Sequence, residues 1–193
     1  MHTYIAILRG INVGGKRRIL MPDLKSLFAD LGYQNIITYI QSGNVIFQTP
    51  DNNSAFIIAN KIENEILEKF NLNVPIIIKS FKEFLEAIQK NPFYKTDNTD
   101  IEKLHLTFLN KNPTFEKLQS IEGFDFSPDK FKVIDNNVFI YCEGKYHRSK
   151  LTNAFFEKKL NTNCSTRNWK TILKIAELAS EINCNPNNSP TLS

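Results

Sequence analysis

Apolar strand patterns and helical repeats alternate in a fixed order along the first 80 residues, and this order limits the folds open to the chain. Runs of Ile, Val, Tyr and Phe bounded by turn residues predict buried strands, whereas apolar residues spaced three and four apart predict amphipathic helices. The patterns predict strands at residues 4–8, 36–40, 45–47 and 74–78 and helices at residues 22–31 and 57–70. The resulting order, β-α-β-β-α-β, is the split unit of ferredoxin-like folds.

The same order of elements returns in the second half of the chain, although no sequence repeat accompanies it. Strands are predicted at residues 104–109, 132–134, 138–142 and 162–166, and helices at residues 115–121, 151–160 and 169–179. We therefore predict an α+β protein with two ferredoxin-like subdomains. They span residues 1–80 and 101–185, with a linking helix and loop at 81–100 and a frayed tail at 186–193.

Composition excludes several classes of protein. With 193 residues, of which 41% are hydrophobic, the chain can bury one sizeable core or two small ones. No apolar run approaches the roughly 20 residues of a membrane-spanning helix, and the first apolar stretch lacks the basic leader of a signal peptide. Three widely spaced cysteines favour a reducing compartment over a disulfide framework and match no zinc pattern. These features predict a soluble cytoplasmic protein.

The sequence shows no recognisable catalytic centre or metal site. The three histidines are scattered, no carboxylates are paired for acid–base chemistry, and no nucleophile stands beside a base. His105 lies within a predicted strand, where we expect it to face outward. The sequence indicates no cofactor and leaves open whether the protein is an enzyme.

Positive charge is concentrated in two segments of the chain. Residues 1–22 carry four Lys or Arg and no acid, and residues 144–170 carry seven Lys or Arg against one Glu. The net charge of +4 then leaves 4 − 4 − 6 = −6 for the remainder. If folding brings the two segments together, they would form a positive field that favours an anionic partner. The alternative is two solvated faces that lie apart.

A glycine-rich loop follows the first strand. Residues 10–16 match the first seven positions of a phosphate-binding P-loop, but Arg17 replaces the Ser or Thr that would bind magnesium. The following helix also begins too late, at Pro22, and the β-α-β-β order is wrong for that fold. A weaker function remains open, in which backbone amides, Asn12 and Lys16 hold an anion. Otherwise the loop is a long connection whose glycines provide positive φ angles.

The dipeptide Ser42–Gly43 predicts a two-residue hairpin turn between the second and third strands. Gln41 and Asn44 flank it with side-chain amides. Turn chemistry alone explains these residues. If the hairpin ends beside the glycine loop, however, both amides would join the same site.

The second basic segment contains two further polar groups. Ser149 stands where we expect a helix to begin and is predicted to cap it. Lys150, Asn153 and Glu157 have the spacing of one helix face.

The last predicted helix has a polar start. Arg167 precedes its N-terminus, a position that favours anions. Asn168 is predicted to cap this helix. Trp169 is either a core anchor, which we favour, or a stacking platform for a ligand.

Four blocks of sequence resemble a known family. They comprise residues 9–16, 38–45, 149–153 and 166–169, and in this order they are similar to the bacterial domain-of-unknown-function family 1697. The resemblance covers the chain from Tyr4 to about Ala179 and implies an α+β fold of two ferredoxin-like subdomains. It implies no established activity, substrate or catalytic residue. The chain departs from the family's usual pattern at Arg17 and Arg18, which add positive charge.

Our leading hypothesis from the sequence is a binding protein whose four blocks converge on one basic cleft between the subdomains. The ligand would be a phosphorylated small molecule, such as a nucleotide, or else a nucleic acid; we favour the small molecule because no RNA-binding aromatic run is present. Phosphate contacts are predicted for Arg9, Lys16, Lys150 and Arg167, orienting contacts for Asn12, Gln41, Asn44, Asn153 and Asn168, and stacking or support for Trp169. The alternatives are an enzyme acting on a small phosphate-bearing metabolite and a purely structural role for the motifs.

Overall fold

The computed structural model describes residues 1–15, 17–95 and 99–184. The chain forms two compact units, each with its own sheet and apolar core. Unit 1 comprises Met1–Leu85 and Lys174–Ser193, and unit 2 comprises Glu86–Leu173. The chain passes from unit 1 to unit 2 within helix α3 (Phe81–Gln89) and returns within helix α6 (Trp169–Cys184).

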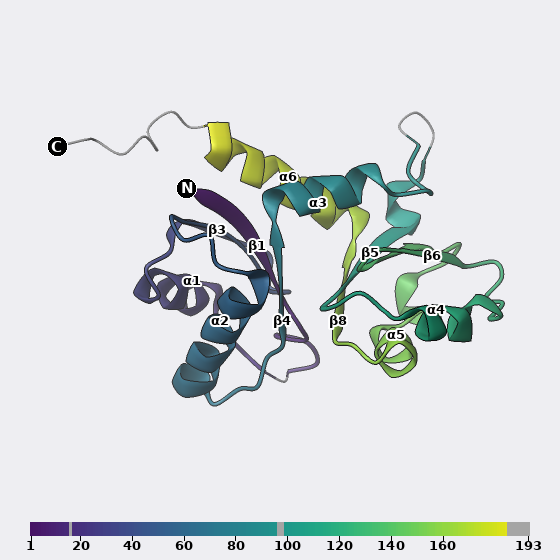
Figure 1. Ribbon diagram of the computed structural model, residues 1–193, viewed down its shortest axis with the longest axis horizontal. Helices are drawn as coiled ribbons and strands as arrows, with labels where there is room; N and C mark the ends of the chain where they lie inside the picture. The colour runs from purple at the N-terminus through teal and green to yellow at the C-terminus, as the bar shows by residue number, and fades with distance from the viewer. Residues whose placement is uncertain (16, 96–98, 185–193) are drawn as a thin grey trace. The chain divides into compact units, whose positions relative to one another are not determined.

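Unit 1 has the predicted β-α-β-β-α-β order (Figure 1). Its elements are β1 (His2–Leu8), α1 (Met21–Asp30), β2 (Gln34–Tyr39), β3 (Asn44–Thr49), α2 (Ala55–Phe70) and β4 (Ile76–Ser80). Every strand pair is antiparallel, and the spatial order is β2-β3-β1-β4. The prediction of a ferredoxin-like subdomain in the first half of the chain is confirmed.

The core of unit 1 follows from the two-residue period of its strands. Tyr4, Ala6 and Leu8 project from one face of β1 and pack with Phe28 of α1 and Ile62 of α2. Figure 1 shows α1 and α2 on the same side of this sheet. The intervening residues of β1 are buried too, so this central strand is buried on both faces. The end of β1 is thereby held in a fixed place, and the glycine loop begins there.

Unit 2 repeats the arrangement. Its elements are a short 3₁₀ helix η1 (Ile101–Lys103), β5 (Leu104–Leu109), α4 (Phe115–Glu122), β6 (Lys130–Ile134), β7 (Asn137–Tyr141), a second 3₁₀ helix η2 (Tyr146–Arg148), α5 (Asn153–Leu160) and β8 (Cys164–Asn168). The sheet is antiparallel in the order β6-β7-β5-β8, the same topology as in unit 1. The second ferredoxin-like subdomain is therefore also confirmed. One edge of its sheet is β6.

The start of α5 differs from the prediction. Thr152 caps this helix, since its hydroxyl accepts a hydrogen bond from the third helical residue at 3.2 Å. Ser149 lies in the preceding loop, where its hydroxyl donates to Asp129 at 2.6 Å. The prediction that Ser149 caps the helix is therefore wrong. Lys150 also lies before the helix, so it shares no helix face with Asn153.

The hairpin turn in unit 1 is longer than predicted. Residues 40–43 connect β2 to β3, with φ angles of 51° at Ile40 and 75° at Gly43. A two-residue turn at Ser42–Gly43 is therefore wrong. At Gly43 an added Cβ would lie 2.7 Å from Ile11 Cδ1 and 2.8 Å from Leu8 Cβ. Glycine is required here both by φ and by the close approach of the chain that follows β1.

We expect the substitution Gly43→Ala to destabilise the protein by about 2–4 kcal/mol, because it adds a steric clash to an unfavourable φ. The control is Gly32→Ala, where φ is 86° but no atom lies within 4 Å of the new Cβ. It should cost only about 1 kcal/mol, the effect of φ alone. Urea denaturation measures both, and equal losses would contradict the close approach.

Candidate functional site

Two loops of unit 1 meet at one end of its sheet. The glycine loop, residues 9–20, follows β1, and the hairpin loop is residues 40–43. The backbone N–H of Leu8 donates to the carbonyl of Gly43 at 2.9 Å, and that of Arg9 donates to Pro75 at 2.9 Å. The glycine loop therefore starts between the hairpin loop and the residues that lead into β4. We call the two loops together the loop surface.

Asn12 fixes the two loops to each other. Its side-chain nitrogen donates to the carbonyls of Ile19 and Gln41, each at 2.9 Å. Its side-chain oxygen accepts from the backbone N–H of Ile19 at 3.0 Å, and its own N–H donates to Arg17 at 3.1 Å. One amide thus closes the glycine loop and ties it to a hairpin 29 residues away in sequence. The hairpin therefore lies beside the glycine loop, which is the condition under which its amides would join the same site.

Part of the loop surface is exposed, whereas Ile11 and Ile19 are buried. Val13 is 65% exposed, and Gly14, Gly15, Arg17 and Arg18 are also exposed. The guanidinium of Arg17 donates weakly to the carbonyl of Arg9 at 3.5 Å. Among the residues that the structure describes, Arg18 forms no ion pair. The predicted site residue Lys16 lies outside the described residues.

The backbone of this surface is strained. Ile40 has a φ of 51° and is 46% exposed. A β-branched side chain in this left-handed region is rare and costs roughly 1–3 kcal/mol. Gly10, Gly14 and Gly15 also have positive φ, at 70°, 59° and 73°. No sequence signal marks Ile40, since glycine and asparagine are the residues that usually indicate this conformation.

The predicted amides of the hairpin have different environments. Gln41 has an exposed side chain, and its carbonyl receives the bond from Asn12. Asn44 is fully buried, and its side chain donates to the carbonyl of Tyr39 and the hydroxyl of Ser42, each at 3.1 Å. The structure thus favours turn chemistry for Asn44, whereas a ligand contact for the exposed Gln41 stays a prediction.

In unit 2, the side chains of Asn153 and Lys150 have different environments. The side-chain oxygen of Asn153 accepts from Thr166 at 2.7 Å and from the thiol of Cys164 at 3.4 Å, so this amide joins α5 to β8. Lys150 is exposed. Only Asn153 belongs to α5, because Lys150 precedes the helix. A ligand contact for either residue stays a prediction.

The last block combines a buried cation with a helix cap. Arg167 is only 8% exposed, and its guanidinium donates to Ser165 at 2.7 Å and to the carbonyl of Thr166 at 2.9 Å. Asn168 accepts from the third residue of α6 at 2.8 Å, which confirms its predicted cap. Trp169 is fully buried against Tyr94, with ring centroids 5.2 Å apart, which supports the core interpretation.

We expect Arg167→Ala to lower the free energy of unfolding by about 2–4 kcal/mol, because it removes a buried side chain and leaves hydroxyl and carbonyl partners unsatisfied. The exposed neighbour Lys170 is the control, and Lys170→Ala should change stability by no more than about 0.5 kcal/mol. Urea denaturation checks both. A loss at Arg167 as small as at Lys170 would restore Arg167 as a surface anion contact.

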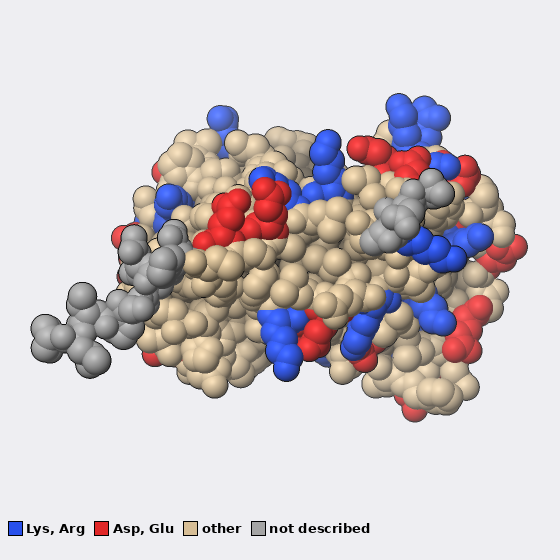
Figure 2. Space-filling model, turned by 90° about the horizontal axis from the view of Figure 1, so that it is seen from above, with Lys and Arg blue, Asp and Glu red and all other residues tan. Residues whose placement is uncertain are grey.

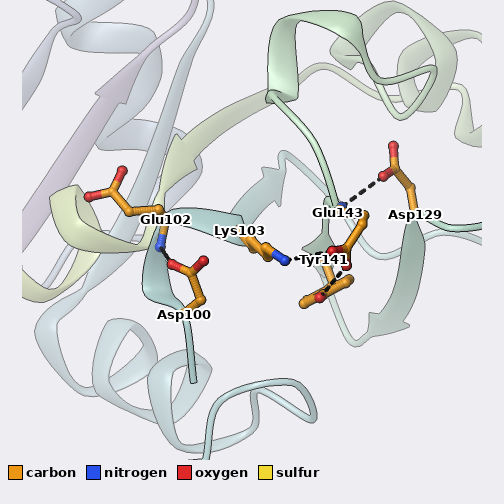
Figure 3. Close-up of polar contacts among 6 residues, drawn as sticks. All are labelled: Asp100, Glu102, Lys103, Asp129, Tyr141 and Glu143. Carbon is orange, nitrogen blue, oxygen red and sulfur yellow. Dashed lines mark hydrogen bonds and ion pairs between the residues drawn. The ribbon is translucent and has the colours of Figure 1, made fainter. Parts of the chain in front are cut away.

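A polar cluster braces unit 2 (Figure 3). Lys103 lies 2.7 Å from Glu143, Tyr141 donates to the same carboxylate, and the backbone N–H of Glu143 donates to Asp129 at 3.0 Å. The Lys103 ammonium, followed by the Tyr141 hydroxyl, holds the pKa of Glu143 below its usual range. In Figure 3, Asp100 lies apart from this cluster and accepts from the backbone N–H of Glu102 at 3.1 Å. These contacts join the start of β5 to β7 and to the loop before β6.

His105 is buried rather than facing outward as expected. It is 7% exposed and stacks on Tyr146 at 4.4 Å between ring centroids, with 19° between the planes. The Tyr146 hydroxyl in turn donates to Thr166 at 3.1 Å. Burial lowers the pKa of His105 below its ordinary value near 6.5.

This lowered pKa predicts a pH-dependent stability. The unfolded chain binds the proton at His105 more readily than the folded protein, so stability is fully present above about pH 6.5 and falls as the pH drops toward the folded pKa. The urea concentration at the midpoint of unfolding should fall between pH 7.5 and pH 5.5, and we expect this fall to be smaller in His105→Gln. The exposed His147→Gln is the control and should keep the wild-type loss. The same loss in all three proteins would contradict the assignment.

The described residues contain neither a cluster of metal-ligating side chains nor a membrane-spanning helix. No group of three or more His, Cys, Asp or Glu side chains there could hold a metal ion. No helix in the described part of the chain is both long and apolar enough to span a bilayer.

Comparison with known proteins identifies the family. The family model described as "Protein of unknown function (DUF1697)" matches residues 1–139. The chain belongs to the DUF1697 family. The prediction of this family is thus confirmed, and the matched residues include the first two sequence blocks, whereas the blocks at 149–153 and 166–169 lie beyond them. No curated protein matches.

The same fold is found in a solved structure. The conserved bacterial protein SP0830 from Streptococcus pneumoniae superposes with a TM-score of 0.74, and the match covers 92% of this chain and 98% of that one. The two sequences are 21% identical, so this likeness supports the fold alone. The function of this DUF1697 protein must therefore be argued from its own residues.

Proposed function

We propose that this DUF1697 protein binds a phosphate-bearing small molecule at the loop surface of unit 1. The observation that carries the proposal is the Asn12 clamp, which holds two loops together and presents Arg17 and Arg18 on their exposed side. Residues 9–20 contain four Lys or Arg and no Asp or Glu. Such a surface favours an anion, and guanidinium groups match phosphate oxygens geometrically.

The glycines of the loop suit the approach of a ligand. Gly14 and Gly15 have successive positive φ angles, and no atom lies within 4 Å of the Cβ position of either. Successive backbone amides in such turns can form a concave binding site for an anion. A phosphate group could therefore reach the main chain here, with Arg17, Arg18 and Gln41 beside it.

Binding suits this surface better than catalysis. Residues 9–20 and 40–43 contain no carboxylate, imidazole or thiol, so their candidate catalytic groups are limited to the hydroxyl of Ser42 and the amine of Lys16. The loops also lack an aromatic side chain on which a base could stack. Without a stacking platform in these loops, a small ligand is favoured over nucleic acid. Figure 2 shows one face of the molecule, on which Lys and Arg side chains lie among Asp and Glu.

We expect Arg18→Ala to weaken binding of ATP roughly tenfold, the scale of one charge-assisted contact, without changing the melting temperature. Isothermal titration calorimetry measures the affinity, with pyrophosphate and glucose 6-phosphate as further probes. The matched control is Lys25→Ala, which removes an exposed charge from α1 outside the loop surface. It should leave affinity unchanged.

Two results would overturn the proposal. One is no saturable binding of any of the three phosphate compounds. The other is an equal loss of affinity in the Arg18 and Lys25 variants, which would indicate unspecific attraction. The salt dependence of binding distinguishes the nucleic-acid alternative. If a fluorescent single-stranded dodecanucleotide binds more tightly than ATP, and its affinity falls steeply as salt is added, the ligand is a nucleic acid and not a small molecule.

A further inference from the structure

Unit 2 contains a cavity that no residue of the loop surface touches. The α4–β6 pocket has a volume of about 470 Å³ and lies between helix α4, the edge strand β6 and the connecting residues 123–129. In Figure 1, α4 and β6 lie next to each other and are joined by a loop at the right of the view. The apolar part of its wall consists of Leu118, Ile121, Phe124, Phe126, Phe131 and Val133. Its size falls within the range of small-molecule sites, roughly 300–1,000 Å³.

The aromatic wall is ordered by ring contacts. Phe124 and Phe126 are nearly parallel, with 14° between their planes and centroids 5.9 Å apart. Phe131 is tilted by 68° to Phe126, with centroids 6.0 Å apart. Phe155 packs edge-on against Phe126 at 5.0 Å and fixes it from behind. The rings are therefore held in place by one another, and a planar ligand would contact the parts of them that remain exposed.

This wall is left partly open to solvent. Phe124 is 42% exposed, and Phe126, Phe131 and Val133 are only half-buried. Removing apolar surface from water is favourable, so a ligand that covers these exposed side chains is stabilised by burying them.

The connecting residues of the pocket are held in place without a ligand. The carboxylate of Asp125 accepts from the N–H and hydroxyl of Ser127, at 2.8 and 2.6 Å. Asp129 accepts from the N–H of Glu143 at 3.0 Å and from the hydroxyl of Ser149 at 2.6 Å. Figure 3 shows the first of these Asp129 contacts. The pocket is thus formed in advance, which lowers the entropy cost of binding.

The charges around the pocket cancel. The rim carries three carboxylates, of Glu122, Asp125 and Asp129, against the ammonium groups of Lys130 and Lys132. The ammonium of Lys159, a third cation, lies 4.5 Å from the centroid of the Phe124 ring. A ligand with net charge of either sign therefore meets both attraction and repulsion, whereas an uncharged ring meets neither.

We infer that the α4–β6 pocket binds a neutral, planar aromatic compound against the wall formed by Phe124, Phe126 and Phe131. The rings hold the ligand by stacking and edge contacts, and Leu118 and Val133 close the site around it. This inference is independent of the phosphate site, since its residues all belong to unit 2 and the loop surface to unit 1.

The probe for this site is N-phenyl-1-naphthylamine, an uncharged dye that fluoresces when it leaves water. We expect saturable binding of one dye per chain to the native protein, with near-ultraviolet circular dichroism unchanged. Amide shifts in a ¹⁵N-labelled sample should be confined to residues around 118–133. The sulfonated analogue 8-anilinonaphthalene-1-sulfonate has the same rings and a negative charge, and it should bind no more tightly.

Two substitutions test the aromatic wall. Phe124→Ser, at a side chain exposed enough for the fold to tolerate the change, should weaken the neutral dye tenfold or more, and so should Phe131→Leu. The matched control is Phe115→Ser on the same helix as Leu118, at a side chain that is 69% exposed and does not line the pocket. It should leave affinity unchanged.

Three outcomes would overturn the inference. They are the absence of saturable binding, an equal loss in the Phe115 variant, and amide shifts spread over the whole chain. A sulfonated dye that binds tenfold more tightly than the neutral one would overturn the uncharged class of ligand. The amide shifts decide the location even if a variant fails to fold.

Discussion

The loop surface of unit 1 depends on one side chain, Asn12, in a backbone conformation that few residues tolerate. Its φ of 55° is acceptable for asparagine, whose short polar side chain favours the left-handed region more than most others. The amide both donates and accepts, so it bonds the carbonyls of Ile19 and Gln41 and the N–H of Ile19 together. Aspartate could not donate these bonds, and serine would be too short to make all three. Because the loop is closed at its base, the residues beyond it can stay exposed without an apolar core of their own.

Most of the fold could be predicted from the sequence, because its signals are local. The strand at residues 104–109 is predicted to the residue, since its Leu and Phe residues are bounded by the polar Lys103 and Asn110. Helix starts are less certain, because several residues can cap. Ser149 and Thr152 both precede the apolar face of α5, and the choice is made by Asp129, which comes from another loop and binds the Ser149 hydroxyl. A contact of this kind, 20 residues away, leaves no local pattern.

The candidate site was less predictable, because exposure is decided by tertiary contacts. Asn12 and Gln41 were found through their residue types, and the structure brings them together. Arg167 has the same appearance in the sequence as any basic residue before a helix, yet β8 buries it against Ser165. The exposure of Ile40 and Phe124 cannot be predicted from the sequence, because apolar residues are expected in cores. Their exposure shows only when the position of the neighbouring loop is known.

The two units show how one topology can support different sites. In unit 1 the connection from β1 to α1 is the long glycine loop at residues 9–20, clamped by an asparagine. In unit 2 the corresponding connection from β5 to α4 is the short stretch of residues 110–114, which leaves little room for a comparable loop. Unit 2 instead has a long connection on the other side of its helix, at 123–129, and this connection lines the aromatic pocket. The sheets and helices are shared, and the length of the loop on either side of the first helix determines whether a unit presents a polar surface or an apolar cavity.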